Sequence, residues 1–340
     1  MAIYEGRCML DNISMCIEPA ARGRCGQVLE PRVQVSVLMS VYARERPEYL
    51  DRSLSSVESQ TLEPVEIVLV ENGPLGGALE DVVASHASSH SELYRVVKLA
   101  EDMGLGRALS VGLDKCSQNI VARMDSDDIC APCRFEREAA YLSGHPEITV
   151  VGSWIAEFET NPNILVASRE PPCDPDELRR YAKFRNPLNH MTVMMRRDQV
   201  LSVGGYSANC MYFEDYLLWI QLLSVNFRLA NIPEHLVYAR TGYGMYGRRG
   251  GWSYALSTIH FLKRARSTGF LSVGDMCIST IVRTAGSLLS PGLRRFVYLH
   301  GLRRVSKDKT SEKANGGQRP GDASPEMKTF LGSDRKEEQK

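Results

Sequence analysis

The sequence contains no long hydrophobic run and few aromatic residues. Of its 340 residues, 8% are aromatic and three are tryptophan. A transmembrane helix needs about 20 mostly apolar residues in succession, and no such stretch occurs. The first residues include Glu5 and Arg7, and the apolar core of a signal peptide does not follow them. We therefore expect neither a membrane-spanning helix nor a secretory signal.

Cysteine is present, but its spacing describes neither a disulfide framework nor a zinc site. The nine cysteines are an odd number, scattered between Cys8 and Cys277. This distribution in a chain of this length is typical of reduced thiols in a cytosolic protein. Cys130 and Cys133 are separated by two residues, but a zinc site needs a second such pair and none occurs. We interpret these two thiols as structural.

The chain as a whole has no net charge, but its parts do. Residues 1–234 contain 22 basic and 33 acidic side chains, a net charge of −11. Residues 235–307 contain 12 basic side chains and one acid, Asp275, a net charge of +11. This segregation predicts an anionic partner, either a surface or a substrate, for the basic segment.

A regular alternation of β-branched runs and amphipathic segments fills the first half. Strands are expected at 33–41, 65–70, 94–99 and 120–124, with helices between them. This spacing is typical of βαβ units, so we predict an α/β fold with a parallel, doubly wound sheet. The second half is less regular. Strands are expected there at 148–155, 164–167, 191–195 and 237–240, and helices at 174–183, 215–223 and 252–266.

Two groups of acids in this pattern indicate chemistry. Asp125, Asp127 and Asp128 follow the fourth strand, at the edge where open α/β sheets bind ligands. Their mutual repulsion is relieved by a divalent cation, and carboxylate oxygens suit Mg²⁺ or Mn²⁺, although a solvated acidic turn is the alternative. Glu214 and Asp215 begin an apolar helix. Asp215 either caps that helix or acts as a general base, and spacing alone leaves both open.

Seven motifs in order make the chain recognisable. They are S-V-Y at 40–42, V-E-N-G-P at 70–74, G-L-G-R-A-L at 104–109, A-R-M-D-S-D-D at 122–128, N-P-L-N-H at 186–190, G-G-Y at 204–206 and F-E-D-Y-L-L-W at 213–219. This order resembles glycosyltransferase family 2, and more narrowly its bacterial exopolysaccharide and amylovoran-type branch. The resemblance covers about Val35 to Gly251. It implies a GT-A fold with a mixed central sheet, a nucleotide-diphospho-sugar donor and inverting transfer without a covalent intermediate.

The resemblance also implies a division of the chain. Residues 32–251 become a GT-A domain, with a nucleotide-binding half at 32–128 and an acceptor half at 129–251. We expect a poorly ordered leader at 1–31, a basic helical extension at 252–305 and a disordered tail at 306–340.

Nucleotide-binding roles follow from the resemblance for residues of four segments: Ser40, Val41, Tyr42, Glu71, Asn72, Gly104, Arg107, Arg123 and Asp125. Asn72 stands where the family has an Asp that accepts a hydrogen bond from the uracil N3–H. An amide carbonyl can accept the same hydrogen bond, but as a neutral group. A UDP-sugar is therefore the expected donor, with a weaker preference for uridine than the Asp of the family would give. Arg123 pairs with a phosphate or steadies the acidic turn.

The resemblance assigns the metal to Asp125 and Asp127, and lets Asp128 orient the loop or the donor sugar. It favours Asp215 as the base, with Glu214 as its neighbour. Donor or acceptor contacts are implied for Asn189 and His190, with structural hydrogen bonding as the alternative. Donor or acceptor contacts are also implied for three arginines that flank a glycine-rich loop: Arg240, Arg248 and Arg249. This loop either closes over the diphosphate or is a solvated basic loop. Trp154, Trp219 and Trp252 are expected in the core.

The basic extension suits an interfacial helix on anionic lipid, with a pair of helices packed on the catalytic domain as the alternative. We favour lipid, because the resemblance implies lipid-linked saccharide acceptors in exopolysaccharide or O-antigen synthesis. The resemblance predicts a cytoplasmic protein that is peripheral at the inner face of the bacterial cytoplasmic membrane. Nucleic acid is not expected, since no reader motif accompanies the charge. The competing functions are a non-catalytic nucleotide-sugar-binding protein and, last, a nucleotidyltransferase, whose glycine-rich phosphate loop is missing from Tyr42–Pro47.

Overall fold

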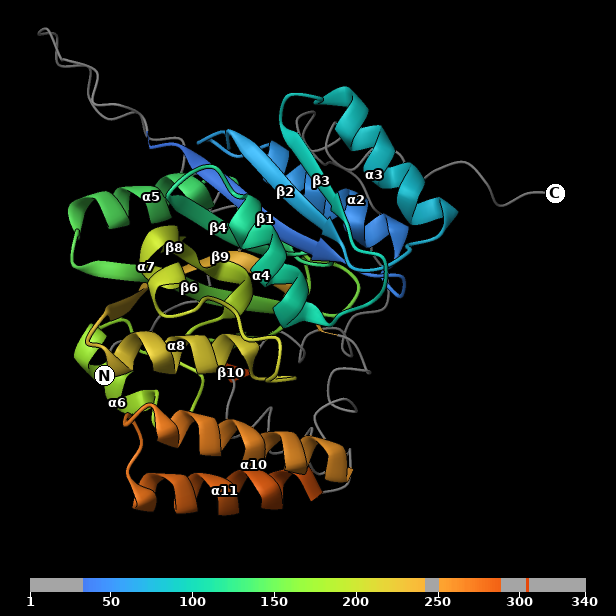
Figure 1. The fold of residues 1–340 in the computed structure, drawn as a ribbon. Helices are drawn as coiled ribbons and strands as arrows, with labels where there is room; N and C mark the ends of the chain where they lie inside the picture. The colour runs from blue at the N-terminus through green and yellow to red at the C-terminus, as the bar shows by residue number, and fades with distance from the viewer. Residues whose placement is uncertain (1–32, 242–250, 289–303, 306–340) are drawn as a thin grey trace, which may run out of the picture. The chain divides into compact units, whose positions relative to one another are not determined.

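One mixed β-sheet organises the chain (Figure 1). The computed structural model describes residues 33–241, 251–288 and 304–305. The expected leader and tail and the positions of Arg248 and Arg249 lie outside these residues. Four parallel strands form the first half of the sheet, in the order β3-β2-β1-β4: β1 (Val35–Val41), β2 (Glu66–Glu71), β3 (Tyr94–Lys98) and β4 (Ile120–Asp125). The predicted doubly wound α/β half is confirmed.

Helices cover both faces of these strands. They are α2 (Pro47–Glu58), α3 (Gly77–Ser89), α4 (Leu105–Lys115) and α5 (Arg134–Gly144). Side chains of β1 alternate between the two faces, because successive residues of a strand point to opposite sides. Val37 and Met39 pack in one core cluster with α2, whereas Leu38 packs in a second cluster with α4. β1, β2 and β4 are therefore largely buried on both sides, as their β-branched composition predicts, whereas the edge strand β3 is partly exposed.

The second half turns the sheet from parallel to mixed. Its strands are β5 (Ile129–Cys130), β6 (Ile148–Phe158), β7 (Leu165–Arg169), β8 (Met194–Arg196), β9 (Arg228–Arg240) and β10 (Arg304–Val305). β8 pairs antiparallel with both β4 and β6, and β9 pairs parallel with β6. The mixed central sheet implied by the resemblance is therefore confirmed, with the parallel strands in the first half and the antiparallel pairings in the second.

Two predicted strands have different bounds. The expected strand at 191–195 begins as a single 3₁₀ turn, η1 (His190–Thr192), because the Thr192 hydroxyl bonds to the Asn189 carbonyl at 2.8 Å. The expected strand at 237–240 is the end of β9, which begins at Arg228. Pro233 has no N–H to donate, and the pairing of β9 with β6 shifts register there. Because of this interruption, the sequence pattern does not predict the first part of β9.

Helices of the second half lie beside the sheet and against one another. They are α6 (Pro175–Tyr181), α7 (Arg197–Ser202), α8 (Glu214–Ser224), α10 (Gly251–Ser267) and α11 (Val273–Leu288). α10 and α11 run side by side and pack on α8 through a third apolar cluster that includes Phe213, Tyr216 and Phe261. The described part of the basic extension is thus a pair of packed helices. No helix among the described residues has both the length and the apolar character needed to cross a bilayer.

The three tryptophans do not share one environment. Trp219 is fully buried in α8, as expected. Trp154 is half-buried on β6, where its indole N–H donates to the Pro171 carbonyl at 3.0 Å. Trp252, at the start of α10, is 73% exposed, so its assignment to the core is wrong. The helical period alone does not say which side of α10 faces α8.

Candidate active site

The carboxyl ends of β1, β2 and β4 meet at one edge of the sheet. Val41 is paired with Glu71 across β1 and β2, and Ser40 with Asp125 across β1 and β4. Three of the predicted nucleotide-binding segments are therefore brought together. Val41, Glu71 and Asn72 are buried there, while Ser40 and Tyr42 are half-buried. An edge of this kind is where open α/β sheets bind their ligands.

Asn72 connects the end of β2 to the loop before α4. Its side-chain carbonyl accepts from the Met103 N–H at 2.9 Å, and its amide donates to the Asp102 carboxylate at 2.7 Å. The same Asp102 oxygen accepts from the N–H of Gly104 at 2.9 Å. Gly104 has a φ of +78°, a conformation that favours glycine. Asn72 and Gly104 thus shape the loop that leads into α4, where Arg107 is exposed in the first turn.

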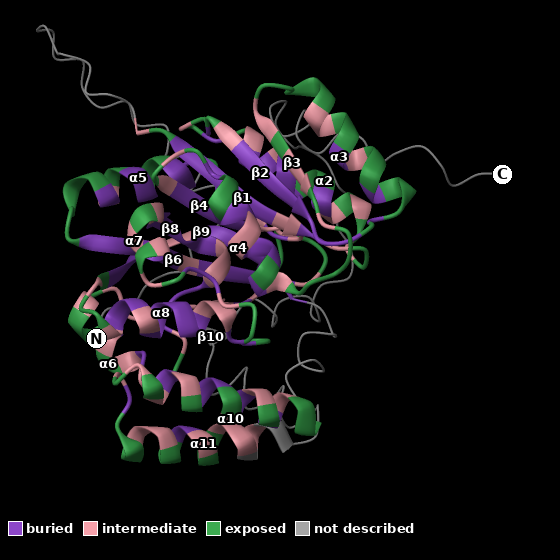
Figure 2. Cartoon of the chain, viewed as in Figure 1, coloured by how far each residue is buried: buried purple, intermediate pink, exposed green. Residues whose placement is uncertain are grey.

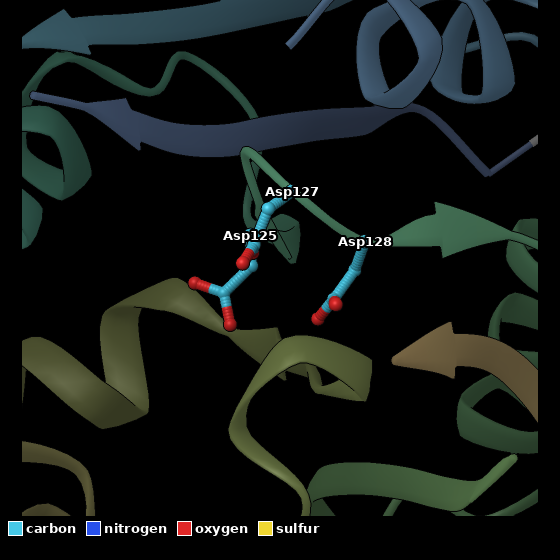
Figure 3. A group of neighbouring side chains, drawn as sticks. All are labelled: Asp125, Asp127 and Asp128. Carbon is cyan, nitrogen blue, oxygen red and sulfur yellow. The ribbon is translucent and has the colours of Figure 1, made fainter. Parts of the chain in front are cut away.

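The acidic turn after β4 gathers three carboxylates (Figure 3). One oxygen from each of Asp125, Asp127 and Asp128 lies within 4.8 Å of the other two. Burial, together with the charges of Asp125 and Glu45, raises the pKa of Asp127 to about 7. Burial also raises the pKa of Asp128 well above its usual range, with Asp127 and Asp125 adding to the effect. A divalent cation removes this repulsion, and the oxygen donor set suits Mg²⁺ or Mn²⁺.

Each carboxylate of the turn has a different setting. Asp125 forms an ion pair with the guanidinium of Arg123, whose side chain is almost completely buried. Asp128 is 2% exposed and accepts from the backbone N–H of Arg240 at 2.7 Å. Asp127 is half-buried between them. The hydrogen bond at Asp128 favours the loop-orienting role among those implied for it, and leaves Asp127 and Asp125 as the stronger candidates for a metal.

A buried clamp from α2 and α5 holds the turn in place. The Ser53 hydroxyl donates to the Asp125 carbonyl at 2.8 Å, and the Ser56 hydroxyl accepts from the Cys130 N–H at 3.1 Å. Arg134 donates to the Arg123 carbonyl at 2.7 Å and pairs with Glu138 at 3.1 Å, both side chains being fully buried. The backbone of the turn is therefore fixed at both ends before any ligand binds.

Cys130 and Cys133 fit the structural interpretation. Both side chains are buried. Cys130 lies 3.2 Å from the Arg134 guanidinium, and its pKa is raised by burial, so it is a packing element of the clamp. No other His, Cys, Asp or Glu group among the described residues has the geometry of a metal site.

Arg240 reaches the acidic turn from β9. Its guanidinium lies 3.7 Å from the centre of the Tyr49 ring and 4.6 Å from that of Phe158, and its Nε donates to the Asp127 carbonyl at 3.1 Å. Burial lowers the pKa of this arginine. Stacked between two rings, Arg240 is held at the turn, in contrast to the freely solvated alternative.

Glu214 and Asp215 form the first turn of α8. Phe213 occupies the N-cap position and its side chain makes no capping hydrogen bond, so Asp215 is not the N-cap residue. One Asp215 oxygen accepts from the Tyr216 N–H at 2.7 Å, and the other accepts from the Asn186 amide at 2.6 Å. Burial raises the pKa of Asp215, and the Asn186 bond opposes that rise. Burial, followed by the charge of Asp215, raises the pKa of Glu214 to about 7.

The two acidic groups belong to one site. A Cβ on Gly106 of α4 would lie 2.5 Å from the Ser207 carbonyl and 3.0 Å from the Glu214 Cβ, so α4 and the start of α8 are in close approach. The charge of Arg123 acts on both groups, since it pairs with Asp125 and lowers the pKa of Glu214 and Asp215. One buried cation thus interacts with Asp125 and Asp128 of the turn and with Glu214 and Asp215 of α8.

Asn189 and His190 support this arrangement. Asn189 is 2% exposed, and its amide donates to the Ser153 carbonyl at 2.7 Å while its side-chain oxygen accepts from Arg169. His190 lies 3.0 Å from the Tyr206 hydroxyl. Burial, aided by the charge of Arg123, lowers the pKa of His190 well below its usual range, so the ring is neutral. These contacts favour structural hydrogen bonding for both residues.

Several important side chains were not singled out by sequence reasoning. Asn186 holds the candidate base, and its only signal was its place at the start of the N-P-L-N-H motif. Ser53 and Arg134 clamp the turn from α2 and α5, where a polar residue on an amphipathic helix is normally read as exposed.

Comparison with known proteins decides the family. The profile described as "Glycosyl transferase family 2" matches residues 36–205, which is half of the chain. This chain belongs to glycosyltransferase family 2. Amylovoran biosynthesis glycosyltransferase AmsE of Erwinia amylovora is 38% identical over 266 residues, covering 77% of this chain and 97% of that protein. A UDP-Gal:alpha-D-GlcNAc-diphosphoundecaprenol beta-1,3-galactosyltransferase of Escherichia coli is 32% identical over 272 residues, covering 79% of this chain and 96% of that protein.

Solved structures agree on the fold of this family 2 glycosyltransferase. A mannosyltransferase from Pyrobaculum calidifontis, in complex with GDP-Man and Mn²⁺, superposes with a TM-score of 0.55 at 16% identity, covering 74% of this chain and 69% of that chain. S. aureus TarS 1–349, in complex with UDP-GlcNAc, superposes with a TM-score of 0.52 at 17% identity, covering 68% and 66%. The chain therefore has the GT-A fold.

Proposed function

We propose that this enzyme transfers a sugar from a nucleotide-diphospho-sugar to a lipid-linked saccharide, with metal-dependent inversion, in exopolysaccharide or O-antigen synthesis. One observation carries the chemistry: three carboxylates converge at the nucleotide edge, and a separate carboxylate is held at the start of α8 within the same site. The AmsE and galactosyltransferase relatives support the biosynthetic class and the lipid-linked acceptor.

Asp125 and Asp127 hold the cation in this proposal, and Asp128 keeps the turn in shape through its bond to the Arg240 backbone. A bound Mg²⁺ or Mn²⁺ supplies positive charge next to the leaving diphosphate. Arg123 and Arg240 bring two further cations to the same turn. Charge fixed in advance is effective here, because the site does not have to reorganise as negative charge develops on the leaving group.

Asp215 accepts the proton of the acceptor hydroxyl while the oxygen of that hydroxyl attacks the anomeric carbon of the donor sugar. The Asn186 amide and the Tyr216 N–H orient the carboxylate, and its raised pKa makes it a stronger base than an exposed Asp. The nucleoside diphosphate leaves from the opposite face of the sugar, so the anomeric configuration inverts. Glu214 remains a neighbour whose charge state is coupled to that of Asp215.

A UDP-sugar is the proposed donor. The Asn72 side chain donates to Asp102 through its NH₂ group and accepts from the Met103 N–H through its carbonyl. The second lone pair of that carbonyl is left to accept a hydrogen bond from a nucleobase. Thermal-shift titration with UDP, GDP and CMP, each with and without Mn²⁺, measures this preference. We expect a manganese-dependent shift with UDP. A shift with GDP alone keeps the mechanism and contradicts the uridine preference.

Activity itself is tested with purified protein, a UDP-hexose and a GlcNAc-diphospho-lipid acceptor. We expect a hexose-extended lipid, with the anomeric configuration inverted. Nucleotide binding with neither transfer nor donor hydrolysis would contradict the proposal and favour a non-catalytic nucleotide-sugar-binding protein of the same fold.

A further inference from the structure

An apolar stripe runs along the side of α11 that faces away from the protein. Its five members recur at helical spacing on one side, and all are exposed: Val273, Cys277, Ile278, Ile281 and Val282. Ile281 is 69% exposed and Val282 is 65% exposed. Figure 2 shows α11 exposed or intermediate along most of its length, in contrast to the buried α8. We call these five residues the α11 stripe.

Contacts on the opposite side fix the orientation of α11. Asp275 forms an ion pair with Lys183 at 3.2 Å, and the buried Ser279 hydroxyl donates to the Lys183 carbonyl at 3.3 Å. The Arg283 guanidinium lies 5.0 Å from the centre of the Tyr216 ring and donates to the Phe184 carbonyl at 2.8 Å. Because these contacts hold the inner side, the stripe cannot turn inward without breaking them.

The neighbouring helix α10 exposes apolar and basic side chains. Trp252 is 73% exposed and Leu256, one turn later, is 64% exposed. Lys263 is exposed on the same helix. Within the described residues of α10 and α11 there are four basic side chains and one acid, and that acid is the Asp275 already paired with Lys183. The pair of helices is therefore both apolar and cationic.

We propose that the α11 stripe docks on the surface of an anionic lipid bilayer. This docking proposal rests on the proposed function in one respect: the acceptor is lipid-linked, so the enzyme must reach it at a membrane. The net charge of residues 235–307 is +11, of the sign that anionic headgroups attract, whereas that of residues 1–234 is −11. Interfacial binding of this kind combines buried apolar area with electrostatic attraction. A stable protein interface takes about 20–30 residues a side, many more than the stripe offers.

Docking here places the candidate base close to the bilayer. α10 and α11 pack on α8 through a cluster that includes Phe213 and Tyr216, the two residues that flank Glu214 and Asp215. Arg283 of α11 lies over the Tyr216 ring. The surface that meets the lipid and the carboxylate that meets the acceptor hydroxyl thus belong to one packed unit.

Vesicle sedimentation of the full chain tests the proposal with a matched pair of variants. Ile278→Glu places a carboxylate in the stripe, and Ile164→Glu makes the same change before β7; the two isoleucines are 54% and 56% exposed. The vesicles are phosphatidylcholine with or without about a third of phosphatidylglycerol. We expect binding only to the anionic vesicles, at least tenfold weaker for Ile278→Glu and unchanged for Ile164→Glu.

Three outcomes would overturn the proposal. They are no vesicle binding by the parent chain, equal losses in both variants, and a dimer in light scattering that only Ile278→Glu dissociates, which would make a second copy the partner of the stripe. No donor or acceptor is present in this assay, so its failure and the failure of the transfer assay are separate results.

Discussion

The acidic turn and the start of α8 both concentrate carboxylates, yet the surroundings of the two groups differ. In the turn, three acids converge on one point from a backbone that Ser53 and Arg134 clamp. At α8, Asp215 is held by side-chain and backbone N–H groups. Burial raises pKa values in both places. Three carboxylates that converge on one point favour a cation, whereas a single carboxylate oriented by two donors favours a proton.

The largest expected effect that distinguishes the start of α8 from the acidic turn is the loss of activity in Asp215→Asn. The amide keeps the shape of the side chain but cannot accept a proton. We expect kcat for transfer to fall by roughly 10²–10⁴-fold, the usual contribution of a general base. Steady-state kinetics with a UDP-sugar checks this, with Glu214→Gln as the matched neighbour, which should retain more activity. Near-normal turnover in Asp215→Asn would remove it as the base.

The clamp behind the acidic turn gives the next largest effect, on stability. Arg134→Met leaves the Glu138 carboxylate buried without its partner and should destabilise the fold by about 3–5 kcal/mol. The double change Arg134→Met with Glu138→Leu removes both charges and should recover most of that loss. Urea denaturation measures the free energy of unfolding of each. If the double variant is no more stable than the single one, the cost lies in the lost bond to the Arg123 carbonyl.

Asn186→Ala gives a smaller effect that appears in the pH profile. The Asn186 amide lowers the pKa of Asp215, so its loss raises that pKa. A base works in its ionised form, so the acid limb of the kcat profile moves to higher pH. We expect roughly a tenfold loss of activity on the acid limb, with recovery at higher pH. Asn163→Ala, at an exposed turn before β7, is the control. A loss that is equal at every pH would contradict the role of Asn186.

The fold was predictable from the sequence as far as local pattern decides structure. Three of the four strands of the first half are apolar runs that are largely buried, and the bounds of all four were predicted to within about two residues. In the second half, the bulge at Pro233 and the 3₁₀ turn at His190 depend on partners far along the chain. Trp252 was misassigned for a related reason, because only packing decides which side of α10 is inside.

The candidate site was predictable where its residues are adjacent in sequence. The three aspartates repel one another within a single turn, and that conflict is visible without a structure. Asn186 lies 29 residues before Asp215, and Ser53 lies 72 residues before Asp125, so their hydrogen bonds follow only from the fold. Phe213, rather than Asp215, occupies the N-cap of α8, a point that the spacing in the sequence left open.

Calorimetric titration of UDP into the parent chain, Asp127→Ala and Asp215→Asn, each with and without Mn²⁺, tests the division between the two acidic groups most directly. The account predicts that the parent chain and Asp215→Asn bind UDP with the same manganese dependence, and that Asp127→Ala loses that dependence. Manganese-dependent UDP binding that survives in Asp127→Ala, or that is lost in Asp215→Asn, would contradict it.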